Sequence, residues 1–226
     1  MEQFLTPEFW VAVGQIIMID ILLGGDNAVV IALASRALPP EQQRLAIAWG
    51  SGAAIVMRIV LTFTAVALLE MPYLKLVGSL FLIWIGIQLL DSDEDGDAIE
   101  SGSTVATAIR TILVADLVMS LDNVLGVAAA AKGNTLLLVL GLAISIPLVI
   151  FGANLLLRLM ERFPIIVTLG AALLGYVGGE MAVNDLAVVG WIDSHFYALH
   201  QIVPIGCAAF ILVVGKLKAA RRQSAV

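Results

Sequence analysis

Cysteine and charged residues are scarce in this chain of 226 residues. Its one cysteine, Cys207, cannot form an intramolecular disulfide, and we assign it to packing. Charged residues make up 13% of the chain, against about a quarter of a soluble domain, whereas 61% of the residues are hydrophobic. The mean hydropathy is +1.03. This composition excludes a soluble enzyme and is typical of an integral membrane protein.

Seven apolar stretches account for most of the chain, and each is about long enough to cross a bilayer, which takes roughly 20 residues. They cover residues 9–33, 45–70, 73–90, 105–131, 134–157, 164–183 and 200–218. The remainder is too short for a soluble catalytic domain, which needs at least about 50 residues. We therefore predict an all-α polytopic membrane protein with seven transmembrane helices, one domain over 1–226 and no enzymatic activity. The N-terminus lacks the features of a cleaved signal peptide, so we expect the first stretch to remain in the mature protein.

The distribution of lysine and arginine predicts the orientation, because cytoplasmic loops are enriched in these residues. A cytoplasmic C-terminus places nine of the twelve basic residues on the cytoplasmic side: Arg36, Arg44, Arg110, Arg158, Arg162, Lys216, Lys218, Arg221 and Arg222. Only Lys75 and Lys132 then lie outside, while Arg58 lies within a span. With an odd number of spans, we expect the N-terminus outside and the C-terminus in the cytoplasm, in a cell inner membrane.

An acidic linker at about 91–104 separates the two halves of the chain. Six acidic residues lie within 91–100, which equals the net charge of −6. The linker opens like the Asp-x-Asp-x-Asp-Gly start of a calcium loop, but its twelfth position is Gly102 and not the bidentate glutamate. We predict a solvated cytoplasmic linker, with weak cation attraction or regulation as the alternative.

The two halves carry an internal repeat. The segment 20–27 (DILLGGDN) matches the segment 116–123 (DLVMSLDN) at an offset of 96 residues, and Gln88 answers Glu180 in a looser match. Three spans separate the copies, so the two segments run in opposite directions through the membrane. Such inverted repeats are common in secondary transporters, which place the substrate site at the repeat interface near the midplane. We predict two inverted three-helix repeats and a seventh helix, over about 9–90, 105–183 and 200–218.

Four aspartates lie within the predicted spans: Asp20, Asp26, Asp116 and Asp122. Each costs about 2.5–3.5 kcal/mol near the centre of a membrane helix, so the four together need compensation of about 10 kcal/mol or more. Arg58 alone cannot neutralise them, which leaves protons, bound metal cations or a water-filled path. The structural alternative is that each acid is protonated or bonded to a neighbouring helix, with the motif asparagines joining helices. The duplication of the motif favours an ion path.

The types of ligand atom limit which cations the site could bind. Carboxylate and amide oxygens, with no histidine or cysteine near the motifs, suit magnesium, calcium or manganese(II) and not zinc or copper. Thioethers would favour manganese, although core packing is their ordinary role. The methionines concerned are Met18, Met119 and Met181. A second group in the outer loop could contact the metal on exit or have no such role: Asp185, Asp193, His195 and His200.

Three motifs resemble those of the TerC integral membrane protein family, also called the tellurium-resistance TerC family. They are Gly-Gly-Asp-Asn at 24–27, Ser-Leu-Asp-Asn at 120–123 and Trp-Ile-Gly at 84–86. The short seven-span form is similar to the branch with bacterial manganese exporters, within the LysE superfamily, and the resemblance covers nearly the whole chain. It implies export of manganese(II) from the cytoplasm with these ion ligands: Asp20, Asp26, Asn27, Asp116, Asp122 and Asn123. Secondary candidates are Glu180, Arg58 and Ser120.

Residues and resemblance together predict a secondary transporter that exports a hard divalent cation, Mn²⁺ first and Ca²⁺ second. The expected partners are the divalent ion and the lipid bilayer, with no nucleic acid and no prosthetic group, and assembly into a homo-oligomer stays open. Two alternatives also stay open. One is a calcium or other cation/proton antiporter that uses the same carboxylates, and the other is a non-transporting membrane scaffold linked to metal or tellurite resistance.

Residue counts within the spans predict how deep the acids lie. Asp20 and Asp122 are about 11 and 9 residues from the outer ends of their spans, so we expect them at one depth. Asp26 and Asp116 should form a second layer, roughly 9 Å away at about 1.5 Å per residue. Because glycine lowers helix stability by up to about 1 kcal/mol, we favour local unwinding near the Gly24–Gly25 pair, which would give one principal midplane site shared by both repeats. The second copy lacks the glycine pair, so whether its helix breaks stays open.

Overall fold

The computed structural model describes residues 7–91, 104–131 and 133–223, and within these ranges a few side chains, that of Asp122 among them, lie outside the description. The predicted acidic linker therefore falls almost wholly outside the described residues. The described residues contain no strand and form these helices: α1 (Pro7–Leu23), α2 (Gly25–Ser35), α3 (Pro40–Leu69), α4 (Leu74–Asp91), α5 (Val105–Ala131), α6 (Thr135–Arg162), α7 (Ile165–Val183), α8 (Val189–His195) and α9 (Leu199–Gln223). The all-α prediction is confirmed.

The helices follow the predicted apolar stretches, with two differences. The first stretch forms two helices, α1 and α2, bent by 54°, and a short helix, α8, precedes α9 at 116°. By length and composition, three helices of the described part could cross a membrane, or up to five if each bent pair counts as one span. The molecule is thus a polytopic membrane protein, and the count of seven spans stays a prediction.

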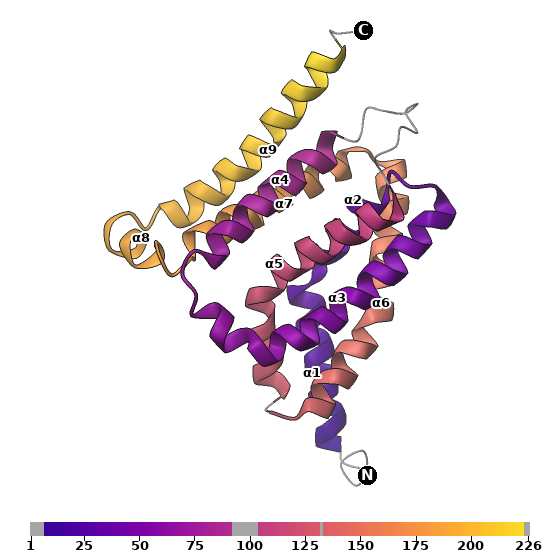
Figure 1. Cartoon of the computed structure of the whole chain (residues 1–226), viewed down its shortest axis with the longest axis vertical. Helices are drawn as coiled ribbons and strands as arrows, with labels where there is room; N and C mark the ends of the chain where they lie inside the picture. The colour runs from indigo at the N-terminus through magenta and orange to yellow at the C-terminus, as the bar shows by residue number, and fades with distance from the viewer. Residues whose placement is uncertain (1–6, 92–103, 132, 224–226) are drawn as a thin grey trace.

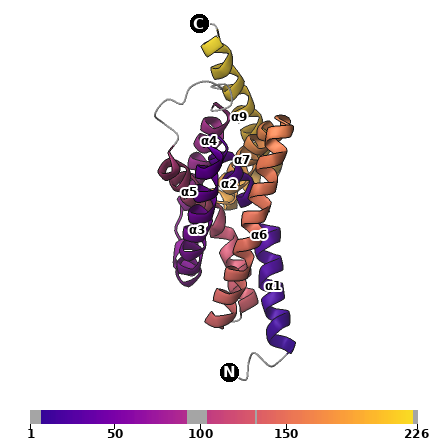
Figure 2. The same cartoon turned by 90° about the vertical axis from the view of Figure 1, so that its right-hand side faces the viewer.

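The helices pack in three sets that share one interior. α3 lies against α5, α1 lies against α6, and α4, α7 and α9 lie side by side (Figures 1 and 2). α2 reaches between the sets and contacts α3, α5, α6 and α7. The beginning of α1 and the end of α9 lie at opposite ends of the longest axis (Figure 1).

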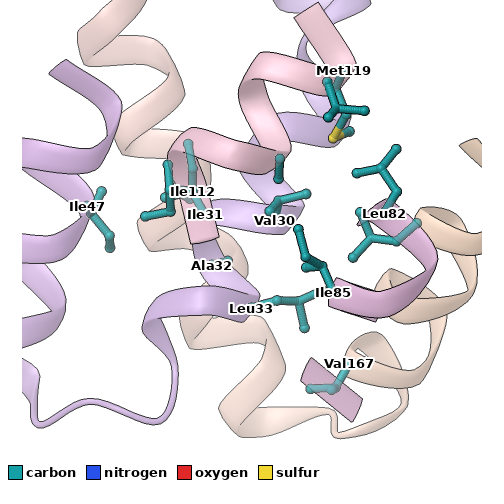
Figure 3. Close-up of a cluster of buried hydrophobic side chains, with 14 of the residues drawn as sticks. Val30, Ile31, Ala32, Leu33, Ile47, Leu82, Ile85, Ile112, Met119 and Val167 are labelled. Carbon is teal, nitrogen blue, oxygen red and sulfur yellow. The ribbon is translucent and has the colours of Figure 1, made fainter. Parts of the chain in front are cut away.

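α2 is the centre of the main hydrophobic core. Seven of its eleven residues are buried. Val30, Ile31 and Leu33 of α2 gather with Leu82 and Ile85 of α4 (Figure 3). A helix surrounded on all sides by apolar neighbours has little freedom to rotate, since interiors are close-packed. The buried part of α2 at 30–33 is therefore held in place by packing.

The predicted methionine contacts separate into core and surface. Met119 and Met181 belong to the buried core, and Met119 lies beside the α2 cluster (Figure 3). Met18 is 56% exposed. Packing is therefore the role that the structure gives to Met119 and Met181, and burial gives no role to Met18.

Glycines allow α7 to lie unusually close to α9. A Cβ atom at Gly175 would lie 2.7 Å from the carbonyl oxygen of Cys207, and one at Gly179 would lie 2.5 Å from Cα of Pro204. No side chain fits at these distances, so the two helix backbones meet directly. Small residues at such crossings are typical of helix pairs in membranes. The backbone of Cys207 lies in this contact, in keeping with the packing role predicted for it.

Side-chain caps fix the beginnings of α5 and α6. The Thr104 hydroxyl accepts a hydrogen bond from the backbone N–H of Thr107 at 3.2 Å. Asn134 accepts hydrogen bonds from the N–H groups of Leu136 and Leu137 at 3.0 and 3.3 Å. Each cap supplies an acceptor for N–H groups that have no partner inside the helix. Gly133 precedes the second cap with a φ of +77°, a backbone conformation that glycine adopts without strain.

Candidate functional site

The site begins at the break between α1 and α2. α1 ends at Leu23 and α2 begins at Gly25, with Gly24 between them. The N–H of Gly24 donates to the carbonyl of Asp20 at 2.8 Å. A Cβ atom on Gly24 would lie 2.6 Å from that same oxygen, so only glycine fits. The interruption predicted at Gly24–Gly25 is confirmed.

The second motif contacts this break directly. The side-chain amide of Asn123, on α5, donates to the carbonyl oxygen of Leu23 at 2.7 Å. The last carbonyls of a helix have no partner inside it, so Asn123 supplies a donor at the end of α1. α5 itself runs without interruption from Val105 to Ala131. The two copies of the motif therefore differ. The first copy interrupts its helix, whereas the second lies in a continuous helix and donates a hydrogen bond to the end of α1.

A buried arginine joins the two copies of the motif. The Arg58 guanidinium, from α3, donates to Asp20 Oδ1 on α1 and to Asp116 Oδ1 on α5, the latter at 2.5 Å. Its Nε donates to the hydroxyl oxygen of Ser120 at 3.0 Å, and that hydroxyl donates to Asp116 Oδ2 at 3.2 Å. Arg58 and Asp116 are each 4% exposed and Asp20 is 1% exposed. Three helices thus meet at one ionic cluster inside the protein.

The cluster holds more acceptor capacity than its single arginine uses. Arginine is always protonated, so two ionised carboxylates leave one negative charge in excess. Among the described side chains, Asp20 Oδ2 and both polar side-chain atoms of Asn27 are buried without a hydrogen-bond partner. A buried polar atom without a partner costs about 1–3 kcal/mol, so these atoms call for a ligand or water. Excess charge and free oxygens together suit a cation.

Asn27 and Asp26 stand beside the cluster at the break. A Cβ atom on Gly24 would lie 3.2 Å from Asn27 Nδ2 and 3.6 Å from Arg58 Nη1, so both side chains approach Gly24. Asp26 is half-buried, and its Oδ1 accepts a hydrogen bond from the N–H of Asn27 at 2.9 Å. Asp26 also interacts electrostatically with Arg58 and Asp116. The break therefore brings one more carboxylate and one amide close to the buried pair.

The other predicted ligands lie away from the hydrogen bonds of this cluster or outside the residues that the structure describes. The side chain of Asp122 is outside the described residues, and Glu180 is exposed near the end of α7. Within the described residues, no three histidine, cysteine, aspartate or glutamate side chains converge as a metal-holding group. The described cluster instead combines two carboxylates with a hydroxyl, an amide and a guanidinium.

The membrane depths of Asp20 and Asp116 stay a prediction. Residue counts place these two acids about 9 Å apart in depth, and both accept hydrogen bonds from the guanidinium of Arg58. One arginine side chain can join two carboxylates at different levels, because it donates from several nitrogens.

The outer group does not form a metal site around Asp185. Its carboxylate is fully buried and accepts N–H groups of Tyr73, Leu76 and Ala187 at 2.9, 3.1 and 2.8 Å. Burial raises the pKa of the Asp185 carboxyl, but these backbone donors outweigh it and hold the pKa below its usual value. The carboxylate fixes the start of α4, where Tyr73 has a φ of +69°. The structure therefore gives Asp185 a structural role at the start of α4.

The two histidines have local partners. His200 Nε2 lies 2.8 Å from Asp193 Oδ1, and this pair links α8 to α9. His195 Nδ1 lies 2.7 Å from the Ser194 hydroxyl and 3.1 Å from the carbonyl oxygen of Trp191. These contacts are within or next to one short helix, so they stabilise the bend before α9.

Arg58 and Ser120 are only secondary candidates from the sequence, whereas in the structure they are central to the cluster. The sequence offers a signal for Arg58, because it is the basic residue that lies well inside a predicted span, away from its ends. The signal for Ser120 is its place four residues after Asp116, one helical turn along the same face. The contact of Asn123 with the end of α1 had no such signal.

Comparisons with known proteins agree with the fold. The sequence profile of the integral membrane protein TerC family matches residues 5–223. The chain is 44% identical over 198 residues to the uncharacterized membrane protein YjbE of Bacillus subtilis, covering 88% of this chain and 90% of that protein. It is 27% identical over 202 residues to the UPF0053 inner membrane protein YgdQ of Escherichia coli, covering 80% and 84%. No solved structure matches the chain. The chain therefore belongs to the integral membrane protein TerC family.

Proposed function

We propose that this protein is a secondary transporter that exports a hard divalent cation, manganese(II) first, from the cytoplasm. The observation that carries the proposal is the buried cluster of Asp20, Asp116 and Arg58 at a broken helix. Discontinuous helices commonly build ion sites in transporters, because unwound backbone and facing side chains supply oxygen ligands there. Ionisable groups inside a membrane bundle mark ion paths by default.

The oxygen chemistry supports a hard ion. The cluster offers the carboxylates of Asp20 and Asp116 and the hydroxyl of Ser120, and Asn27 adds an amide oxygen. These are ligands that magnesium, calcium and manganese(II) accept, and no histidine or cysteine joins them among the described residues. The resemblance to manganese exporters selects manganese from this group, with calcium as the second candidate.

Arg58 can balance part of the negative charge of the proposed site when no metal ion is bound. A divalent cation between two carboxylates would balance their charge fully, whereas Arg58 balances half of it. We therefore infer that the guanidinium and the cation compete for Asp20 and Asp116. When the ion leaves, Arg58 returns and removes the cost of two unpaired buried carboxylates.

Helix packing supports the proposed inverted repeats. In the proposed repeats, α1 and α2 together correspond to α5, α3 corresponds to α6, and α4 corresponds to α7. When each helix is replaced by its counterpart, the main helix pairs of one repeat match main helix pairs of the other. The pair of α3 and α5 becomes the pair of α6 with α1 and α2, and α4 with α7 becomes itself. The cluster lies where the first helices of the two repeats meet, as expected for a substrate site at a repeat interface.

Metal flux into sealed vesicles tests the proposal. Purified protein is reconstituted in liposomes that contain a metal-sensitive dye, and Mn²⁺, Ca²⁺, Mg²⁺ and Zn²⁺ are added with and without a pH gradient. We expect Mn²⁺ flux above that of empty liposomes, and a loss of at least tenfold in Asp116→Asn, which keeps the volume of the side chain. Glu180→Gln is the matched control, because Glu180 is exposed and takes no part in the hydrogen bonds described for the cluster.

Each outcome of the flux assay decides between the open alternatives. Calcium flux above manganese flux, driven by the pH gradient, would favour a calcium/proton antiporter. Flux equal to that of empty liposomes for all four metals would favour the non-transporting scaffold. Equal flux in wild type and Asp116→Asn would contradict the assigned site even if transport occurs.

A further inference from the structure

A cavity on the outer face of α3 and α5 has a lining that the ion site does not explain. It measures about 500 Å³ and is lined by Met57 of α3 and, on α5, by Ala106, Ile109, Arg110, Leu113, Val114 and Leu117. On α5 the residues 106, 110, 113 and 117 recur at helical spacing, so they form one stripe along the helix. We call this feature the α3–α5 groove.

The groove is apolar except at one end. Arg110 is its one charged lining residue, and it is exposed. Arg110 makes no ion pair with any described residue, and its side chain is exposed. Leu113 and Val114 are half-buried and Leu117 is 38% exposed, which leaves an apolar surface next to that charge. An occupant must therefore carry both an anionic group and an apolar chain.

The depth of the groove fits the boundary between lipid headgroups and hydrocarbon. α5 has 27 residues and is about 40 Å long, which exceeds the roughly 30 Å of the hydrocarbon core by about two turns. If α5 crosses the bilayer as predicted and is centred in it, Arg110, five residues after Val105, lies close to the level where the headgroups begin. Leu117 lies about 10 Å deeper, which is within reach of an acyl chain.

We propose that the α3–α5 groove binds an anionic phospholipid, with its phosphate on Arg110 and an acyl chain along Leu113, Leu117 and Met57. Basic residues at the cytoplasmic boundary of membrane helices attract anionic headgroups, and each contributes about 1 kcal/mol near the surface. The apolar stripe adds a contact that a free phosphate cannot make. The headgroup and the chain together distinguish this site from general attraction of basic loops to the membrane.

The groove lies on the same two helices as the ionic cluster. Met57 and Leu117 line it, and their chain neighbours Arg58 and Asp116 form the buried ion pair on the inner side of the same two helices. A lipid in the groove therefore contacts both helices that hold the pair. We expect its binding to hold α3 against α5 and to raise the melting temperature of the protein.

Lipid titration tests the proposal without reference to transport. Delipidated protein in a neutral detergent is titrated with phosphatidylglycerol and with phosphatidylcholine of the same acyl chains, and bound lipids are counted by native mass spectrometry. We expect wild type to bind one phosphatidylglycerol at least fivefold more tightly than phosphatidylcholine. Arg110→Gln should lose this preference. Arg158→Gln should keep it, because Arg158 is also exposed on the predicted cytoplasmic side but lies outside the groove.

Two further arms separate the apolar and anionic parts of the site. Leu113→Trp fills the groove and should weaken binding of both lipids at least threefold. Glycerol phosphate, which has the anionic group without the chains, should leave the melting temperature unchanged where phosphatidylglycerol raises it. The proposal is overturned if Arg110→Gln keeps the full preference, if Arg158→Gln loses as much, or if glycerol phosphate gives the same rise.

Discussion

At the scale of single residues, Arg58 decides whether two acids can remain buried. One guanidinium holds Asp20 and Asp116, and Ser120 fixes its third donor. Removal of one partner from a buried ion pair typically costs about 3–5 kcal/mol, because the remaining charge is left without compensation. The same arithmetic explains how a divalent cation could take the place of the guanidinium.

Arg58→Met should therefore destabilise the protein strongly, and Mn²⁺ should reverse much of the loss. At about 2–4 °C per kcal/mol for a protein of this size, the melting temperature in detergent should fall by roughly 6–20 °C. Saturating Mn²⁺ should raise it more in this variant than in wild type, because the cation then neutralises Asp20 and Asp116. Arg44→Met, at an exposed position, is the control and should change little. Equal responses of Arg58→Met and wild type to Mn²⁺ would count against competition at these carboxylates.

Asp185→Asn should weaken the start of α4 by about 1–3 kcal/mol, since an amide has one acceptor oxygen for three backbone donors. The folded-state pKa of Asp185 is below its unfolded value, so its contribution is present above that unfolded value, about 3.9, and is lost as the pH falls through the folded one. The difference in unfolding free energy between wild type and variant should be constant above about pH 5 and shrink below about pH 4. Glu70→Gln, at an exposed position near this turn, should show no such difference.

At the scale of helices, the two copies of the motif take different forms for a reason that is visible in the sequence. The first copy carries Gly24–Gly25 and breaks, whereas the second has Ser120 and Leu121 and stays helical. Leu121 is buried in the core, where a continuous helix keeps it packed. The first copy supplies the interrupted backbone, and the continuous second copy supplies Asn123, which donates a hydrogen bond to the end of α1.

The two glycines of the break should tolerate alanine very differently. A Cβ atom at Gly24 would lie 2.6 Å from the Asp20 carbonyl, whereas one at Gly25 would meet nothing within 4 Å. Gly24→Ala should therefore cost about 1–3 kcal/mol of stability and displace Asp20 from Arg58, which would lower Mn²⁺ flux at least tenfold. Gly25→Ala should melt close to wild type and retain most of the flux. Similar losses in both variants would mean that the break needs flexibility and not space.

The sequence predicted the break and the acids but not their partners. Glycine pairs and carboxylates within an apolar stretch are local signals, so Gly24, Asp20 and Asp116 could be named from the residues alone. Which acids share Arg58 depends on how far α1, α3 and α5 slide along one another, and that is a property of packing. The cap by Asn123 and the cap by Asp185 join segments about 100 residues apart, so no local pattern indicates them.

At the scale of the whole molecule, the cluster ties the halves of the chain together. Asp20 and Arg58 come from the first half and Asp116 and Ser120 from the second, so the ionic contacts cross the boundary between the proposed repeats. α9 packs outside this pair against α7 and α4. If the two halves are inverted relative to each other in the membrane, the loop before α5 and the loop before α9 lie on opposite sides of the membrane.

Single-cysteine labelling tests that orientation. On a Cys207→Ser background, Ser194→Cys places a thiol in α8 at an exposed position, and Ser101→Cys places one in the acidic linker. An impermeant maleimide should label Ser194→Cys in intact cells, whereas Ser101→Cys should react only after the membrane is permeabilised. The expectation rests on nine basic residues against two across the predicted sides. Labelling of both positions in intact cells, or of neither, would require an even number of spans between them and would remove the basis for two inverted three-helix repeats.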